Sequence, residues 1–143
     1  MTVKTILSRK GTDVVTADPN ATLGDAVKTL GARRIGALVV TGADRRMVGI
    51  LSERDIVRVL AEKGPSALDA PIAEAMTRKV MTCSAHDTVS ELMERMTEGK
   101  FRHLPVVEQG RLAGIVSIGD VVKSRVQEME QESAALRDYI RTA

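Results

Sequence analysis

Apolar residues recur every three or four positions in two separate stretches of the chain, residues 23–30 and residues 89–96. This spacing places the apolar side chains along one face of a helix, so each stretch predicts a helix that buries one stripe. Thr22 and Thr88 stand directly before the two stretches, and an acidic residue follows each of them three positions later. Such a pair is a capping box, which predicts that both helices begin at these threonines.

Short apolar runs separated by turn-forming residues follow each predicted helix. They predict two strands in each half of the chain, with Gly42 and Gly110 in the turns that join them. A second helix is predicted after each pair of strands, and the first of these helices ends at Gly64, ahead of Pro65. The four predicted strands are residues 37–40, 47–51, 104–107 and 112–116.

The two halves also resemble one another residue by residue. "GILSERD" (residues 49–55) matches "GIVSIGD" (residues 114–120), "GALVV" matches "HLPVV", and "VKTIL" matches "IAEAM". Each half therefore predicts the same unit: a short strand, a helix, two strands and a helix. Because about 60 residues with one buried sheet face are marginal alone, we expect the two units to pack sheet to sheet. The result is a pseudo-twofold α/β (α+β) fold with paired clefts where its halves meet.

The repeat divides the chain into four parts: a first repeat (1–64), a linker (65–70), a second repeat (71–126) and a C-terminal helix extension (127–143). A heptad-like row of six positions runs through the end of the second repeat and the extension. It indicates either a homodimer contact or a helix folded back on its own domain, and we predict a homodimer to which this helix contributes. The six positions are Val122, Val126, Met129, Ser133, Leu136 and Ile140.

The composition excludes several classes of partner. Hydrophobic residues make up 43% of the chain, but with one Phe, one Tyr and no Trp the core must be aliphatic. Aromatic platforms for single-stranded nucleic acid are nearly absent, and a net charge of +2 does not favour nucleic acid either. No segment approaches the roughly 18 apolar residues of a membrane span, so we expect no membrane partner.

Cys83 is the only cysteine, which excludes a disulfide framework or a thiolate zinc site within one chain. A reducing, cytoplasmic location is the simplest fit, because the first residues also lack the pattern of a signal peptide. His86 and His103 lie too far apart in sequence to suggest a metal site. We expect no metal, no catalytic residues and no enzymatic activity, since no nucleophile with a nearby base and no Gly-rich phosphate loop is present.

Both "GILSERD" and "GIVSIGD" contain a serine followed three positions later by an aspartate, and this pair has two interpretations. Ser52 with Asp55, and Ser117 with Asp120, could simply cap the helices that follow. Alternatively, a serine at a helix N-terminus can bind an anion, and an aspartate one turn later can accept hydrogen bonds from a diol. A phosphate beside a cis-diol describes a ribonucleotide.

The positive charge that a phosphate needs is present before the strands that lead into both motifs. Ordinary solvated loop charge explains each cation singly, but the placement is repeated in the two halves. These residues are Arg33 and Arg34 in the first half and Lys100, Arg102 and His103 in the second, and Arg54 adds a cation inside the first motif.

Two copies of this unit, with "HLPVV" and "GIVSIGD" in the second, resemble the cystathionine β-synthase (CBS) domain, a tandem pair of which is called a Bateman module. The resemblance extends from about Val3 to about Val126 and is most specific in "GKFRHLPVVEQGRLAGIVSIGD". In the first repeat Gly36 and Ala37 stand where the second has His103 and Leu104. The family implies a regulatory, disc-shaped dimer that binds AMP, ADP or ATP, or sometimes NAD or S-adenosylmethionine.

The resemblance implies two clefts shared between the repeats, with aspartate on the ribose and with serine and cations on the phosphate. One cleft would take Ser117 and Asp120 with Thr16, Gly36 and Ala37. The other would take Ser52, Arg54 and Asp55 with Thr82, Arg102 and His103, and Lys100 adds a cation.

The sequence therefore predicts a regulatory CBS-pair module that binds an adenosine-containing ligand and signals to a separate, unidentified protein. The alternative is a ligand-free interaction and dimerisation module of the same fold. Retention of serine and aspartate in both repeats favours ligand binding.

Overall fold

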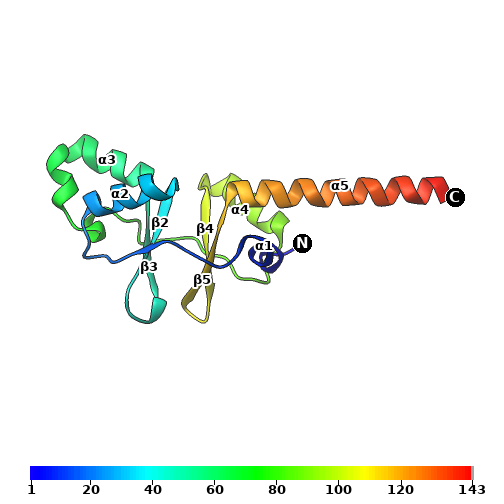
Figure 1. Ribbon diagram of the computed structural model, residues 1–143, viewed down its shortest axis with the longest axis horizontal. Coiled ribbons are helices and arrows are strands. Elements are labelled where there is room, and N and C mark those ends of the chain that lie inside the picture. Colours follow the sequence, from blue (N-terminus) through cyan, green and yellow to red (C-terminus); the bar gives the residue numbers. More distant parts are fainter. Residues whose placement is uncertain (143) are drawn as a thin grey trace.

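The computed structural model describes residues 1–142, which form two similar halves and one long helix that leaves them (Figure 1). The first half contains β1 (Thr16–Ala17), α2 (Leu23–Arg33), β2 (Ala37–Thr41), β3 (Met47–Ser52) and α3 (Glu53–Lys63). The second contains α4 (Val89–Gly99), β4 (His103–Glu108), β5 (Arg111–Ser117) and the start of α5 (Ile118–Thr142). Helix α1 (Val3–Lys10) precedes them, and short 3₁₀ turns, Ala43–Arg45, Pro65–Asp69 and Ile72–Glu74, lie in the connections.

The helix, the two long strands and the second helix of the predicted unit are confirmed in both halves. The capping boxes at Thr22 and Thr88 are formed, with each threonine hydroxyl accepting the backbone N–H three residues later. Helix α3 ends at Gly64, whose φ of 75° lies in the left-handed region that suits glycine. All four long strands lie within one residue of their predicted bounds.

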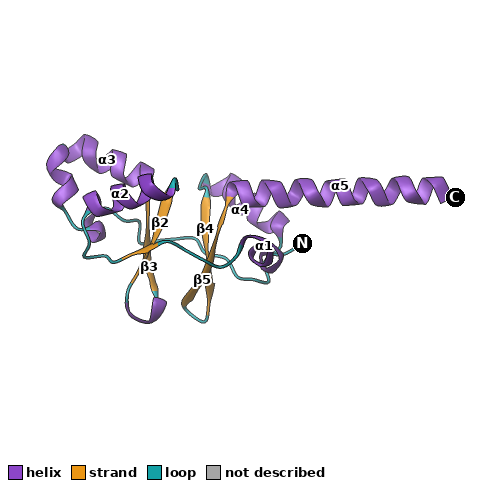
Figure 2. Cartoon of the chain, in the orientation of Figure 1, coloured by secondary structure: helices purple, strands orange, loops and turns teal. Residues whose placement is uncertain are grey.

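Helices cover one side of each sheet, and the strands of the two halves stand next to each other (Figure 2). In the first half β1 pairs parallel with β2, and β2 pairs antiparallel with β3. In the second half β4 and β5 form an antiparallel pair, and the expected short strand is reduced to a parallel bridge between Cys83 and Val106. That shortening makes the second sheet smaller than the first.

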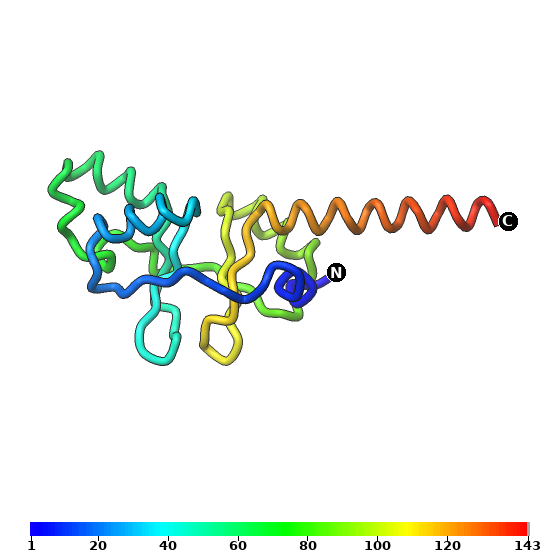
Figure 3. Tube along the Cα trace, in the orientation of Figure 1, coloured from blue at the N-terminus to red at the C-terminus, as the bar shows by residue number. Residues whose placement is uncertain are grey.

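Helix α1 was not predicted, and its position changes the meaning of the repeat. Its residues Val3, Ile6 and Leu7 are buried in the core of the second half, whereas Ile72 and Met76 are buried in the core of the first. The opening segment of each repeat therefore packs against the other repeat. Figure 3 shows the same exchange: the chain begins beside the second half and then crosses to the first.

Backbone pairing holds the exchanged segments at equivalent places. Thr2, before α1, bridges Thr88 at the start of α4, and Pro71 bridges Thr22 at the start of α2. The two motif glycines provide the space that these segments need. A Cβ atom at Gly49 would lie 2.8 Å from the Met76 sulfur, and one at Gly114 would lie 2.8 Å from a Leu7 methyl group.

Helix α5 does not fold back on the molecule, so that alternative for the C-terminal extension is wrong. Only its first turns pack on the second half, where Val121 and Ser124 are buried. Beyond Glu128 every described residue of the helix is exposed, and the helix extends away from both halves (Figure 1). No helix of the described chain is both long enough and apolar enough to cross a membrane.

Candidate functional site

A cavity of about 510 Å³ lies between the two halves at the C-terminal end of β3. Its volume falls within the range of roughly 300–1,000 Å³ that is usual for small-molecule sites. The first half contributes Gly36, Ala37, Ile50, Ser52, Glu53, Arg54 and Asp55. The second half and the segment that leads into it contribute Thr77, Lys79, Val80, Met81, Lys100, Phe101, Arg102 and His103.

At the base of this cavity Ser52 caps α3 in the manner that the motif predicted. The Ser52 hydroxyl accepts the Asp55 backbone N–H at 3.3 Å, and the Asp55 carboxylate accepts the Ser52 backbone N–H at 3.0 Å. The cap and the candidate ligand site are therefore one structure, and the two interpretations of the motif do not exclude each other.

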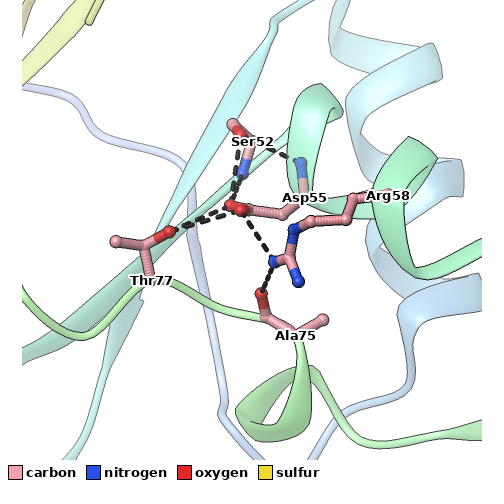
Figure 4. A network of polar contacts seen from close by, with 5 residues as sticks. All are labelled: Ser52, Asp55, Arg58, Ala75 and Thr77. Carbon is pink, nitrogen blue, oxygen red and sulfur yellow. Dashed lines mark hydrogen bonds and ion pairs between the residues drawn. The ribbon is translucent and has the colours of Figure 1, made fainter. Parts of the chain in front are cut away.

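The Asp55 carboxylate has additional donors around it (Figure 4). The residue is 8% exposed, and its carboxylate accepts hydrogen bonds from the Ser52 hydroxyl at 3.1 Å, Arg58 at 3.3 Å and the Thr77 hydroxyl at 3.3 Å. An ionised carboxylate offers about four acceptor positions, so this network occupies most of them. A ligand hydroxyl must therefore replace one of these donors, and the Ser52 and Thr77 hydroxyls belong to residues that line the cavity, whereas Arg58 does not line it.

The remaining walls combine positive charge with apolar surface. Arg54, Lys79, Lys100 and Arg102 line the cavity, against the carboxylates of Glu53 and Asp55. The balance of formal charge is therefore positive. The apolar side chains are Ile50, Val80, Met81 and Phe101. A ligand with an anionic end and a flat, weakly polar end matches this lining.

His103 lies where the two halves meet. A Cβ atom at Gly36 would lie 3.6 Å from its ring and 3.5 Å from the Glu53 carboxylate, which are ordinary contact distances, so Gly36 lies beside both side chains. Burial lowers the pKa of His103, and the nearby Lys10 charge lowers it further, which outweighs the opposite effects of Asp120 and Glu53. The imidazole is therefore held neutral near pH 7.

The second serine–aspartate motif is built differently. The Asp120 carboxylate accepts the Ser117 backbone N–H at 2.9 Å, which repeats the cap of the first motif. Its second partner is Lys10 of α1, whose ammonium group lies 2.7 Å from Asp120 and also donates to the Ile115 carbonyl at 3.0 Å. The cavity beside Asp120 has a volume of only about 120 Å³.

Electrostatics follow from these contacts. Burial acts to raise the pKa of Asp120, but the Lys10 ammonium group and the Ser117 backbone together outweigh it and hold this pKa below its usual value. Asp120 is therefore ionised and paired with a cation from the same chain, in the place where a ligand was expected.

The structure groups the predicted site residues differently from the two expected clefts. Gly36 and Ala37 line the 510 Å³ cavity with Ser52 and Asp55, rather than a cleft with Ser117 and Asp120. Thr16 lines a separate depression of about 630 Å³, together with Arg33, Arg45 and Ala113, the residue directly before the second motif. Thr82 is half-buried and is not among the described residues that line the 510 Å³ cavity.

Sequence reasoning missed three polar residues that matter at the two motifs: Lys10, Thr77 and Lys79. A signal for them exists, because "SRK" (residues 8–10) and "TRK" (residues 77–79) directly follow the matched segments "VKTIL" and "IAEAM". The equivalence of Lys10 and Lys79 is thus readable from the repeat, whereas their different partners are not.

Comparison with known proteins shows what this architecture is similar to. The CBS-domain family model matches residues 3–62 and again residues 72–126. A CBS-domain-containing protein from Agrobacterium tumefaciens, of known crystal structure, is 52% identical with a TM-score of 0.84, over 87% of this chain and 99% of its own. The mitochondrial CBS-domain-containing protein CBSX3 of Arabidopsis thaliana is 37% identical over 83% of this chain, which spans 60% of that relative's length.

Two proteins among the solved relatives contain adenosine-type ligands. The CBS domain pair of protein MJ0100, in complex with 5′-methylthioadenosine and S-adenosyl-L-methionine, is 28% identical with a TM-score of 0.79, over 90% of this chain and 98% of its own. The CBS domain protein PAE2072 from Pyrobaculum aerophilum, complexed with AMP, is 30% identical with a TM-score of 0.74, over 84% of this chain and 89% of its own.

Proposed function

The chain belongs to the CBS-domain family, and from that premise we propose that it is a regulatory module which binds an adenosine-containing ligand in the 510 Å³ cavity between its repeats. The observation that carries the proposal is the lining of this cavity, where a serine at a helix N-terminus, a buried aspartate, four cations and an apolar wall converge. AMP, ADP and ATP fit this set of groups best, since they combine a phosphate, a cis-diol and a flat base.

Each part of such a ligand has a partner in the proposed pose. The phosphate lies near Ser52, the first N–H groups of α3, and the cations Lys79, Lys100 and Arg102. A ribose hydroxyl takes the place of the Thr77 hydroxyl on Asp55, which keeps the carboxylate fully hydrogen-bonded. The base lies against the apolar wall.

The ligands of the solved relatives support this class of compound and widen it. AMP in one relative and 5′-methylthioadenosine with S-adenosylmethionine in another share adenine and ribose but differ in charge. S-adenosylmethionine and NAD therefore stay candidates beside AMP, ADP and ATP. The positive lining of this cavity favours the phosphorylated compounds.

The proposed output is regulation of a separate protein by a cytoplasmic homodimer, without catalysis of its own. One observation favours the second candidate function, a ligand-free interaction module: the ion pair of Lys10 with Asp120 occupies the second motif. We therefore propose one nucleotide per chain, in the cavity beside Asp55, instead of two.

Calorimetry with AMP and adenosine tests the proposal. A charge-assisted hydrogen bond contributes roughly 1.5–3 kcal/mol, so AMP should bind about ten- to a hundredfold more tightly than adenosine. Arg102→Gln should remove part of this preference. Arg78→Gln is the matched control, because Arg78 donates to the Ala73 carbonyl and does not line the cavity. Equal affinities for AMP and adenosine would contradict the phosphate contact, and absence of binding by either would favour the ligand-free module.

A further inference from the structure

The outer part of α5 is a helix without a partner in its own chain. Residues 129–142 are all exposed, and α5 stands alone beyond the second half (Figure 1). An isolated helix of about 12–15 residues is marginal in water, because most helical stability in proteins comes from packing of an apolar face. The helix therefore needs a second surface to be stable.

One face of α5 carries the apolar row that such a surface would cover. Val122, Val126, Met129, Leu136 and Ile140 are between 46% and 65% exposed, and Ser133 completes the row. At about 100° per residue, this row lies roughly 130° around the helix from Val121 and Ser124, which face the protein's own core. The row is thus free to contact another molecule while the first turns of α5 stay packed.

We infer that this row is the contact between two copies of the chain, joined as a parallel coiled coil of their α5 helices. The row has the 4-3-4-3-4 spacing of a coiled-coil seam, with Val126, Ser133 and Ile140 at one set of core positions and Val122, Met129 and Leu136 at the other. The inference names the surface and orientation of the proposed homodimer, and it does not depend on ligand binding.

Charges beside the seam select the parallel orientation. In a parallel pair, a residue directly before a Val126-type position faces the residue five places later on the second helix. Arg125 then faces Glu130 of the second copy, and Glu132 faces Arg137 of the second copy, so both pairs attract. Arg125 already binds Glu128 within its own helix at 3.0 Å, and its guanidinium has further N–H groups for a second carboxylate.

An antiparallel pair would place like charges together. With the two seams aligned over their full length, Glu130 faces Glu130, Glu132 faces Glu132, and Lys123 faces Arg137 of the second copy. Each of these contacts is repulsive, so the same seam disfavours this orientation. A second copy of the chain in parallel orientation is thus the occupant that both the apolar row and its flanking charges fit.

Sedimentation equilibrium of a seam variant and a matched control tests the surface. Leu136→Asp places a charge in the middle of the seam, and we expect it to weaken the dimer at least tenfold. Ala134→Asp introduces the same charge two residues away, off the seam, and should leave the dimer constant within twofold of the unmodified chain. A monomeric unmodified chain, or equal dimer constants for both variants, would overturn the inference.

Disulfide cross-linking tests the orientation. Val126→Cys and Ile140→Cys are made singly, at opposite ends of the seam and roughly 21 Å apart along the helix. In a parallel pair each cysteine meets its own counterpart, so both variants should form disulfide dimers. In an antiparallel pair the two ends cannot both do so, and failure of either variant overturns the parallel arrangement. Native Cys83 does not interfere, because burial raises the pKa of its thiol to about 12.

Binding of AMP to Leu136→Asp separates this inference from the proposed function. The substitution lies far along α5 from the residues that line the cavity, so AMP affinity should stay within twofold of the unmodified chain. Loss of the dimer with retained AMP binding supports the coiled coil. A dimer constant that Leu136→Asp leaves unchanged would contradict the coiled coil, whether or not AMP binds. Absence of AMP binding by the unmodified chain would contradict the ligand proposal and leave the coiled coil unaffected.

Discussion

The two serine–aspartate motifs have nearly the same sequence and the same helix cap, but their aspartates have different partners. Asp55 accepts the Thr77 hydroxyl beside a cavity of about 510 Å³, whereas Asp120 binds the Lys10 ammonium group beside one of about 120 Å³. The motif alone therefore does not define a binding site. The segment exchanged from the other repeat decides whether the aspartate has room for a ligand.

The difference between the two exchanged segments has a local cause. Helix α1 continues through Lys10 and ends at Gly11, whose φ of 95° suits glycine and lets the helix close on Leu7. The matching residue after "TRK" is Val80, a β-branched residue that favours extended backbone. There the helical turn ends earlier, and Thr77 pairs with Ile50 of β3 through two backbone hydrogen bonds of 2.9 and 3.0 Å.

The glycine at the start of each motif provides the largest expected contrast. At Gly49 a Cβ atom would lie 2.8 Å from the Thr77 carbonyl oxygen, which is backbone, whereas at Gly114 it would meet the flexible end of Leu7. Gly49→Ala should therefore destabilise the fold by about 3 kcal/mol and Gly114→Ala by about 1 kcal/mol or less. Urea unfolding of both variants measures this difference, and equal losses would show that the two segments are held with equal rigidity.

Periodicity and turn chemistry allowed most of the fold to be predicted, because they act within a few residues of each position. The capping boxes at Thr22 and Thr88 and the end of α3 at Gly64 depend on such local signals. The exchange of the opening segments is long-range. No local pattern indicates that Leu7 packs on Gly114 or that Met76 packs on Gly49.

Only part of the candidate site was predicted, because it too depends on long-range packing as well as on local signals. Ser52, Asp55 and Arg102 were expected together and do line one cavity. Lys10 was missed because the match of "VKTIL" with "IAEAM" implies that both opening segments have the same structure and surroundings. In the structure the first segment forms a helix that continues through Lys10, and the two segments therefore differ at this position. Gly36 and Thr16 were assigned to one cleft through the resemblance to the family, but they lie in different cavities.

Replacement of each aspartate by asparagine tests the functional side of the comparison. An amide has one acceptor oxygen, so Asp55→Asn cannot accept from Ser52 and Thr77 as the carboxylate does and should cost roughly 1–3 kcal/mol of stability. It should also greatly reduce the rise in melting temperature that saturating AMP gives. Asp120→Asn should cost less than about 1 kcal/mol, because its ion pair is partly exposed, and should leave the AMP effect intact. Thermal-shift titration measures both quantities, and a reversed order would identify Asp120 as the ribose partner.

Substitution of the two equivalent lysines should change AMP binding in opposite ways: loss of Lys10 should allow binding at the second motif, and loss of Lys79 should weaken binding at the first. Lys10→Met removes the partner of Asp120, and we expect a second, weaker AMP to bind per chain, with a loss of less than about 1 kcal/mol in stability. Lys79→Met removes a cation from the open cavity and should lower AMP affinity about tenfold without creating a second site. Calorimetric stoichiometry distinguishes the two variants. One AMP per chain in Lys10→Met would show that Lys10 is not what closes the second motif.

The smallest expected effect is on the titration of His103, which lies between the two motifs. Burial and the Lys10 charge lower its pKa, while Asp120 and Glu53 act in the opposite direction. Because the folded-state pKa is below the unfolded value of about 6.5, the unfolded chain takes up the proton first as pH falls, and stability decreases below that pH.

Lys10→Met removes one of the charges that lower the pKa of His103 and should therefore raise this pKa. Lys79→Met leaves Lys10 in place, so it is the control and should change the pKa of His103 less. The chain has only two histidines, so NMR titration of the imidazole resonances resolves His103 from His86 in all three proteins. If both lysine variants changed the pKa of His103 equally, Lys10 and Lys79 would act alike on this imidazole. The position of Lys10 would then not explain the difference between the two motifs.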